Sequence, residues 1–443
     1  YFTNLRKYDV NYELRANGSV AKRGKVALDV SPQATAEFVI PVTVTVGKPG
    51  VEYFVHFSVV TRQAEPLIPI GHEIAQEQFR LPLETEKDSY EASGKALGWK
   101  AENGKVVVSS SNVYFELDKA TGMVTSYKVN GTEFFDKAFG VQPNFWRAPN
   151  DNDYGNSNPK RLQIWKESSR DFKVSDTAVR EEGETVLMSV TYDLPAGNQY
   201  LITYRIYRDG VVNVNVKFTQ TDREAEKTEV LEDTNLATFT PGKKVKKKDV
   251  LEVPRIGVRF RIPHVMNRVE YFGRGPVENY VDRNAGSMVG RYKTSVEEMY
   301  VNYVRPQENG HRTDTRWVSF TNTAGRGLLV LAEKTIGFNA LRNTVEDFDS
   351  EESSHPYQWR NRSSKEVAGK NEAEAKNVLR ITPRDFVEVC IDMKQQGVAG
   401  YDSWGAKVQP GYTIPASRDY VWGFTLIPIK NVGDVNKSLR YTY

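Results

Sequence analysis

The chain has 443 residues, of which 60 are basic and 57 are acidic, so its formal net charge is only +3. This length predicts two or three domains. The near balance of charge excludes a field strong enough to attract nucleic acid or an anionic membrane, and no run of about 18 apolar residues marks a membrane span, so we expect neither as a partner.

Residues 1–83 show the two-residue periodicity of β-strands and are predicted to form a small immunoglobulin-like sandwich. Strands are expected over residues 38–46 and 53–59, since apolar side chains alternate along both. Asn17-Gly18 favours a type I′ hairpin, because this turn needs a positive φ at both central residues. Residues 1–5 already look like strand sequence and the later strands are too few for two full sheets, so we expect a sandwich truncated at its N-terminus.

Residues 84–98 are polar with little periodicity, which predicts a linker. A second, larger domain is expected over residues 99–443. Its first strands are indicated at residues 106–108 and 113–117, where apolar and aromatic side chains are dense.

A hairpin around Asp209-Gly210 is the clearest supersecondary signal of the larger domain. The polar residues Asn213, Asn215 and Lys217 alternate with apolar ones, so one face of this hairpin is expected to meet water. Helix signals are few and short, the best being the capping-box spacing from Ser295 to Glu298. The predicted fold class is therefore all-β.

The segment 145–155, FWRAPNDNDYG, combines aromatic rings with amide and carboxylate groups on a turn-forming sequence. Asp and Asn bond their own backbone and leave polar groups exposed, while Phe and Trp rings can stack on the apolar face of a pyranose. The segment therefore indicates sugar binding, although a surface turn of a sandwich explains the same residues equally well. It is not an EF-hand, because Leu162 stands where the calcium loop needs Glu.

Three further motifs follow in order: residues 273–283, GRGPVENYVDR, residues 306–312, PQENGHR, and residues 402–404, DSW, inside a glycine-bounded loop. Together the four motifs resemble the C-terminal part of the bacterial β-galactosidases of glycoside hydrolase family 2. The resemblance covers most of the chain. It implies that the larger domain is a large antiparallel supersandwich, similar to galactose mutarotases. It also implies that the chain is part of an enzyme that hydrolyses terminal non-reducing β-D-galactosides with retention.

The resemblance implies accessory roles for residues of this chain. Trp404 matches a tryptophan that reaches from the last domain into the active site and stacks on substrate. The loop that starts at Gly155 and Asn156 corresponds to one that borders the sugar site. The expected anchors of that loop are polar residues of the first motif: Arg147, Asp151, Asn152 and Asp153.

In the enzymes that the chain resembles, both catalytic glutamates lie in a (β/α)8 barrel with a magnesium site beside them. No alternation of strands with helices of about 10 to 15 residues exists in this sequence. We therefore expect no catalytic residue, metal ligand or cofactor within it, and magnesium only in the parent enzyme. The expected partners are a β-galactoside, the N-terminal catalytic portion of the same polypeptide, and further copies in a homo-oligomer.

An aldose-1-epimerase-like enzyme is an alternative, since its chemistry needs a Glu base and a His acid near a ring oxygen. Glu308 with His311, or Glu278 with His264, could supply that pair. For Glu278, a salt-bridged scaffold with a nearby arginine is the simpler interpretation, and the same holds for Asp282-Arg283.

A non-catalytic carbohydrate-binding module is a further alternative. It would use the rings of Trp146 and Trp404 as stacking platforms. A purely structural module that builds an oligomer remains open as well.

Overall fold

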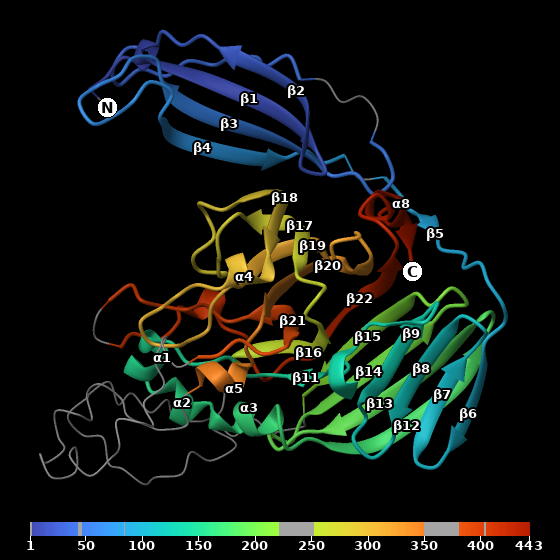
Figure 1. Cartoon of the computed structure of the whole chain (residues 1–443). Coiled ribbons are helices and arrows are strands. Elements are labelled where there is room, and N and C mark those ends of the chain that lie inside the picture. The colour runs from blue at the N-terminus through green and yellow to red at the C-terminus, as the bar shows by residue number, and fades with distance from the viewer. Residues whose placement is uncertain (1, 43–46, 84, 221–251, 350–380, 403–404) are drawn as a thin grey trace, which may run out of the picture.

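The computed structural model describes residues 2–42, 47–83, 85–220, 252–349, 381–402 and 405–443. Strands dominate these ranges, and the helices are short (Figure 1). The prediction of an all-β fold is confirmed. Within the described ranges, no helix is long and apolar enough to cross a membrane.

A four-stranded antiparallel sheet forms the N-terminal region, at the top of Figure 1. Its turn at Asn17 and Gly18, with φ values of 44° and 79°, is the predicted hairpin. The order of its strands is β2 (Ser19–Val26), β1 (Tyr8–Ala16), β3 (Tyr53–Thr61) and β4 (Glu73–Arg80).

The strand predicted over residues 38–46 is wrong in its described part. Residues 38–42 form no ladder, and the side chains of Phe38 and Val39 are 45% and 97% exposed. Pro41 interrupts this run, and a proline has no N–H to donate to a ladder. Residues 43–46 lie outside the described part of the chain.

The segment predicted as a linker is attached to the last strand of the chain. Within it, β5 (Asp88–Ser89) pairs in parallel with β23 (Tyr441–Thr442). The ring of Tyr90 packs against Tyr207, with centroids 5.3 Å apart, and against Tyr443, with centroids 4.4 Å apart. The domain boundaries at residues 83 and 99 stay a prediction.

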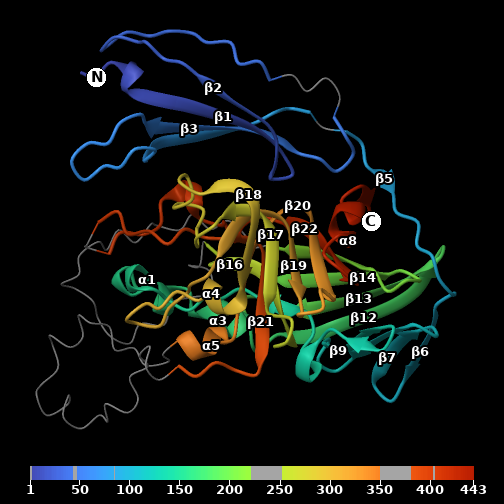
Figure 2. The same cartoon turned by 45° about the horizontal axis from the view of Figure 1, so that its top comes forward.

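A large antiparallel sheet forms most of the remaining chain and branches at its longest strand, β20. The first part of β20 pairs with β22 and its last part with β21, while β19 extends along its other edge and continues through β17 to β18. Figure 2 shows how strongly the strands turn across the sheet. The predicted large antiparallel supersandwich is confirmed. From one edge the order is β11 (Gln142–Asn144), β16 (Arg255–Pro263), β21 (Phe386–Gln395), β20 (Gly327–Leu341), β22 (Tyr420–Ile429), β15 (Val212–Thr219), β14 (Gln199–Ile206), β13 (Thr185–Asp193) and β12 (Lys173–Glu182), and the branch holds β19 (Arg312–Thr321), β17 (Arg268–Gly275) and β18 (Met288–Ser295).

A smaller five-stranded sheet packs against the large one and closes the main core. Fully buried side chains from both sheets meet there: the rings of Phe115 and Tyr204 lie 5.5 Å apart, and the Tyr127 hydroxyl donates to the carbonyl of Gly210 at 2.5 Å. Each large apolar side chain buried in this way contributes about 1.5–3 kcal/mol. The strands predicted at residues 106–108 and 113–117 belong to this sheet and are confirmed. Its order is β10 (Thr132–Glu133), β9 (Val124–Val129), β8 (Val113–Asp118), β7 (Lys105–Ser109) and β6 (Gly98–Glu102).

The hairpin of β14 and β15 has its apolar face in the core, as predicted. On its other face Asn215 and Lys217 are exposed, but Asn213 is buried, contrary to the prediction of a wet face. Its amide donates to the Thr425 hydroxyl of β22 at 3.0 Å. A second apolar cluster, to which Leu331 and Ile427 belong, lies on that side and excludes water from this end of the hairpin.

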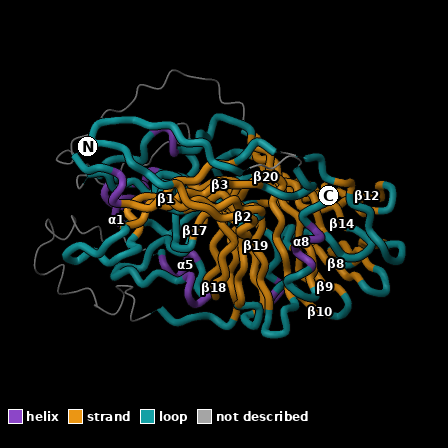
Figure 3. Tube along the Cα trace, turned by 90° about the horizontal axis from the view of Figure 1, so that it is seen from above, coloured by secondary structure: helices purple, strands orange, loops and turns teal. Residues whose placement is uncertain are grey.

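The helices are short and sit at sheet ends, where Figure 3 shows them as isolated purple turns. The predicted capping box is confirmed, since Ser295 and Glu298 begin α4. Residues 151–155, predicted as a turn, form a helix because Asn150 and Asp153 make a second capping box. In the described ranges the helices are α1 (Asp151–Gly155), α2 (Asn158–Arg161), α3 (Gln163–Ser168), α4 (Val296–Met299), α5 (Val345–Phe348) and α8 (Asp434–Ser438), and 3-10 turns lie at Leu5–Lys7, Asp136–Ala138 and Pro410–Tyr412.

Candidate functional site

The first two motifs, far apart in the sequence, both bond to one stretch of backbone, residues 396–406, which we call the convergent segment and within which the fourth motif begins at Asp402. Its described parts are residues 396–402 and 405–406. The third motif bridges the first two, because the N–H of Glu308 donates to the Ala148 carbonyl at 3.1 Å and the N–H of Gly310 donates to the Glu278 carboxylate at 2.8 Å. The fold therefore assembles the motifs into a single site.

Arg147 attaches the first motif to the convergent segment. Its guanidinium donates to both carboxylate oxygens of Asp153, at 2.8 and 3.1 Å, and also to the carbonyls of Gln396 at 2.8 Å and Gly397 at 3.0 Å. Both charged side chains are almost fully buried. A planar guanidinium can hold a carboxylate and two carbonyls at once, which fixes the backbone direction as well as its distance.

Asn152, a predicted anchor, and Asn156, at the start of the predicted site-bordering loop, each make one hydrogen bond to the same segment. The Asn152 amide donates to the Val398 carbonyl at 2.9 Å, and the Asn156 amide donates to the Ala406 carbonyl at 3.4 Å. Asp151 is exposed and lies 3.6 Å from the guanidinium of Arg305. Among the described residues, neither Asp151 nor Asp153 bonds directly to the convergent segment, and Asp153 acts on it through Arg147.

The backbones of Gly155 and Gly405 lie so close together that there is little room for a side chain between them. A Cβ on Gly405, where φ is +86°, would lie 2.4 Å from the Gly155 carbonyl oxygen. A Cβ on Gly155 would lie 3.2 Å from the Gly405 Cα. The close approach joins the end of α1 to the convergent segment.

Trp404, predicted to stack on substrate, lies outside the described residues, as does residue 403. Two hydrogen bonds join the described residues before this gap to those after it. The N–H of Ala406 donates to the Asp402 carboxylate at 3.2 Å, and the Tyr401 hydroxyl donates to the Lys407 carbonyl at 3.1 Å.

The second motif contributes two carboxylates with different partners. Glu278 forms the predicted scaffold, since Arg283 donates to it at 2.9 Å and the Tyr303 hydroxyl also donates to it. Arg283 thus belongs to the predicted scaffold, whereas Asp282 bonds to backbone groups instead of an arginine. Its oxygens accept the backbone N–H groups of Val398 and Ala399 at 3.0 and 2.9 Å.

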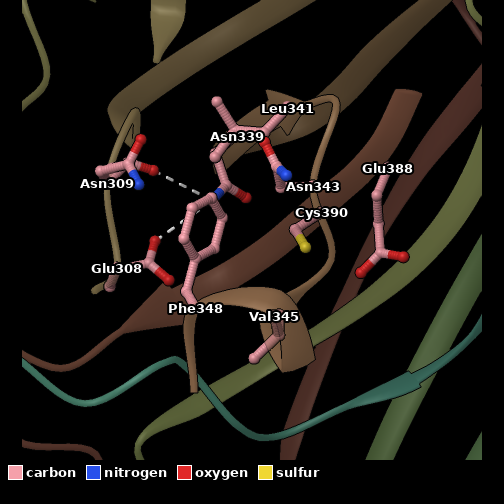
Figure 4. Close-up of a pocket in the computed structure, with 9 residues that line it drawn as sticks. All are labelled: Glu308, Asn309, Asn339, Leu341, Asn343, Val345, Phe348, Glu388 and Cys390. Atoms are coloured by element: carbon pink, nitrogen blue, oxygen red, sulfur yellow. Dashed lines mark hydrogen bonds between the residues drawn. The ribbon is translucent and has the colours of Figure 1, made fainter. Parts of the chain in front are cut away.

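Behind the convergent segment lies a buried charged cluster centred on Arg255. Its guanidinium lies 3.3 Å from the carboxylate of Glu308 and 3.1 Å from that of Asp392. A small cavity next to Glu308 has room for about one water molecule. Figure 4 shows the amide of Asn339 between Glu308 and Asn309 in the wall of this cavity.

Burial changes the proton affinity of this cluster. It raises the pKa of Asp392 to about 7, and it raises the pKa of Glu308, in both cases against the opposing effect of Arg255. It lowers the pKa of His311 well below the usual value, and Arg255 acts in the same direction. One guanidinium between two buried carboxylates favours a proton on one of them.

The pairs considered for epimerase chemistry are not arranged for it. Glu308 and His311 are 6% and 1% exposed, and the imidazole stacks on the Tyr280 ring, so neither is open to a sugar. His264 and Glu278 lie beyond opposite ends of β17, an eight-residue strand about 26 Å long. No single ring oxygen can lie beside both.

Trp146 cannot act as a stacking platform, because its side chain is buried in the main core. Its indole N–H donates to the Asp349 carboxylate at 2.9 Å. Phe145 is fully buried as well. The aromatic half of the first motif therefore belongs to the core, and only its polar half borders the convergent segment.

The described residues contain no group of three His, Cys, Asp or Glu side chains placed to hold a metal ion. Glu308 and Asp392 converge, but on Arg255, which already supplies the positive charge. These residues do not fit the magnesium that the resemblance implies for the parent enzyme.

Sequence interpretation missed Arg255, Asp392 and the backbone contacts of Asp282. A signal for Asp392 was present: it stands in the strand run 386–393, FVEVCIDM, where a charged residue inside an apolar run needs a buried partner. No local signal identifies Arg255 as that partner, because the two residues lie on strands β16 and β21, far apart in sequence.

Known proteins are similar to this chain in sequence over most of its length. Residues 109–426 match the family described as beta galactosidase small chain, and residues 1–82 match beta-galactosidase, domain 4. The beta-galactosidase of Priestia megaterium is 31% identical over 97% of this chain and 37% of its own length. That of Streptococcus thermophilus is 27% identical over 97% of this chain and 36% of its own length.

Among solved structures, a putative mutarotase from Salmonella typhimurium aligns with 78% of this chain and 97% of its own, at 9% identity and a TM-score of 0.37. The chain spans a little over a third of the length of the curated relatives it matches. The match to residues 109–426 covers well over half of the chain. This chain therefore belongs to the beta-galactosidase small-chain family.

Proposed function

We propose that this chain is the C-terminal, non-catalytic part of a beta-galactosidase that hydrolyses terminal non-reducing β-D-galactosides with retention. Its role is to border the sugar site and to support assembly with the catalytic portion of the same polypeptide. The observation that carries the proposal is that Arg147 of the first motif and Asp282 of the second both bond to the backbone of residues 396–399.

The state of the carboxylates supports a non-catalytic role. Glycoside hydrolysis uses two carboxyl groups on either side of the scissile bond. Within the described motifs, Asp153 and Glu308 are each buried against an arginine, while Glu278 is held by Arg283 and Tyr303. Such carboxylates stabilise a scaffold and are poorly placed to protonate a leaving group or attack an anomeric carbon.

In this proposal the convergent segment presents Trp404 to the galactoside, and α1 with the loop from Gly155 supports the adjoining wall. The acid/base and nucleophilic glutamates and the magnesium ion belong to the catalytic portion. Homo-oligomer formation is part of the proposal for the complete enzyme. The similarity to beta-galactosidases over 97% of the chain supports each of these assignments.

The test compares this chain alone with the complete enzyme, using a nitrophenyl β-galactoside. We expect no turnover by the chain alone and turnover with the complete enzyme, with β-galactose as the first product by NMR. Turnover by the chain alone, or α-galactose as the first product, would contradict the proposal. Polarimetry with α-galactose tests the epimerase alternative, for which the chain alone would accelerate mutarotation.

A further inference from the structure

Asp282 binds the convergent segment through backbone groups only. The N–H of Val398 donates to one carboxylate oxygen at 3.0 Å, and the N–H of Ala399 donates to the other at 2.9 Å. Hydrogen bonds to an ionised carboxylate are about twice as strong as those between neutral groups. Two such bonds to successive residues fix both the place and the direction of the backbone.

The segment needs an external support at this point. Ala399 and Gly400 have φ values of 56° and 94°, so two successive residues occupy the left-handed region. For a residue with a side chain, this conformation costs about 1–2 kcal/mol. The Asn152 amide adds one further bond to this stretch, donating to the Val398 carbonyl at 2.9 Å. The carboxylate of Asp282 therefore stabilises a path that the local sequence disfavours.

Gly397 makes room for this carboxylate. A Cβ at residue 397 would lie 2.3 Å from an oxygen of Asp282. Unlike Gly400, Gly397 does not have a left-handed backbone, so an alanine can adopt its conformation. The glycine is required by the contact with Asp282 and not by the backbone angles.

We infer that Asp282 is a positioning residue for galactoside hydrolysis: it holds residues 397–399 beside α1, so that this part of the wall lies correctly against the bound sugar. This inference rests on the proposed function, in which that wall borders the sugar. Asp282 itself does not touch the substrate. Its loss should therefore weaken galactoside binding more than it slows the reaction of bound substrate.

The chain offers a matched control in Asp434. One oxygen of its carboxylate also accepts two successive backbone N–H groups, those of Lys430 and Asn431, at 3.1 and 3.3 Å. It begins α8, which lies on the side of the molecule away from α1 in Figures 1 and 2. Removing its charge perturbs a loop in the same way without reaching the convergent segment.

The experiment introduces Asp282→Asn, Gly397→Ala, the double change and Asp434→Asn into the complete enzyme. It measures kcat and KM with a nitrophenyl β-galactoside, together with the melting temperature. We expect KM to rise at least about 3-fold in both single variants of the contact, with a smaller change in kcat. The double variant should raise KM by less than the product of the single effects, because both remove the same contact. Asp434→Asn should lower the melting temperature as much as Asp282→Asn and leave KM unchanged.

An unchanged KM in Asp282→Asn and Gly397→Ala would overturn the inference, as would an equal rise in KM in Asp434→Asn. Either result leaves the proposed function intact, provided that the unmodified enzyme hydrolyses the galactoside. If the unmodified enzyme does not hydrolyse it, the proposed function itself fails. The two failures are therefore distinguished by the first measurement of the series.

Discussion

The N-terminal sheet and the convergent segment are both held by arginine–carboxylate pairs of similar length but very different burial. Arg62 and Asp9 lie 2.7 Å apart on the N-terminal sheet, with side chains 39% and 27% exposed. Arg147 and Asp153 lie 2.8 Å apart, with side chains 2% and 3% exposed. Water screens the first pair, which contributes at most about 1 kcal/mol. Because the two distances are nearly equal, the difference in burial decides how much each pair contributes to the free energy of unfolding.

The largest expected effect comes from Arg147→Met. The substitution leaves the carboxylate of Asp153 buried without its guanidinium and removes the donors from the carbonyls of Gln396 and Gly397. Breaking a buried pair in this way costs about 3–5 kcal/mol. We expect a loss of that size in the free energy of unfolding, measured by urea denaturation of the chain.

Arg62→Met is the matched control, since it removes the same charge from an exposed pair. Its loss should stay below about 1 kcal/mol and should disappear at high salt. Equal losses in Arg62→Met and Arg147→Met would show that burial does not separate the two regions.

A second pair of variants tests the contact between α1 and the convergent segment. Gly405→Ala places a Cβ 2.4 Å from the Gly155 carbonyl oxygen, in a left-handed conformation, so we expect it to lower the free energy of unfolding by about 2 kcal/mol. Gly155→Ala meets only the Gly405 Cα, at 3.2 Å, and gains helix propensity, so its change should stay within about 1 kcal/mol. Urea denaturation of the two variants measures which one loses more unfolding free energy. A larger loss in Gly155→Ala than in Gly405→Ala would contradict the close contact of Gly405 with the Gly155 carbonyl.

Much of the fold could be predicted from the sequence, because strand periodicity and turn chemistry are local. The hairpins at Asn17-Gly18 and Asp209-Gly210 and the capping box at Ser295 needed no knowledge of distant residues. The errors arose where a distant element decides the outcome. Asn213 is buried by a cluster on other strands, and residues 38–42 lose their ladder at a proline.

The site was predictable in part, for the same reason. Resemblance identified the polar residues of the first motif, of which Arg147 and Asp153 form the buried attachment. The same motif also suggested an exposed Trp146 that stacks on sugar. Its local sequence does not distinguish this role from a buried position in the core, because polar neighbours are compatible with both. The bonds from Asp282 to backbone N–H groups leave no trace in side-chain pattern, since any residue but proline supplies an N–H.

The last prediction concerns pH and again contrasts the two regions. Burial raises the pKa of Asp392 to about 7 in the folded chain, above its ordinary value of 3.8. The folded state then keeps a proton that the unfolded state releases, so this residue's contribution to stability is greatest below about pH 4 and falls until about pH 7. Relative to Asp392→Asn, the unmodified chain should therefore lose unfolding free energy over that range, by at most about 1.4 kcal/mol per pH unit. On the N-terminal sheet, the hydrogen bond from Arg62 lowers the pKa of Asp9, so its contribution is complete above the ordinary value. The difference between the unmodified chain and Asp9→Asn should therefore stay flat from about pH 4.5 to about 7.5, and urea titrations at several pH values measure both slopes. Parallel slopes in the two variants would mean that Asp392 is ionised throughout, with Arg255 outweighing its burial.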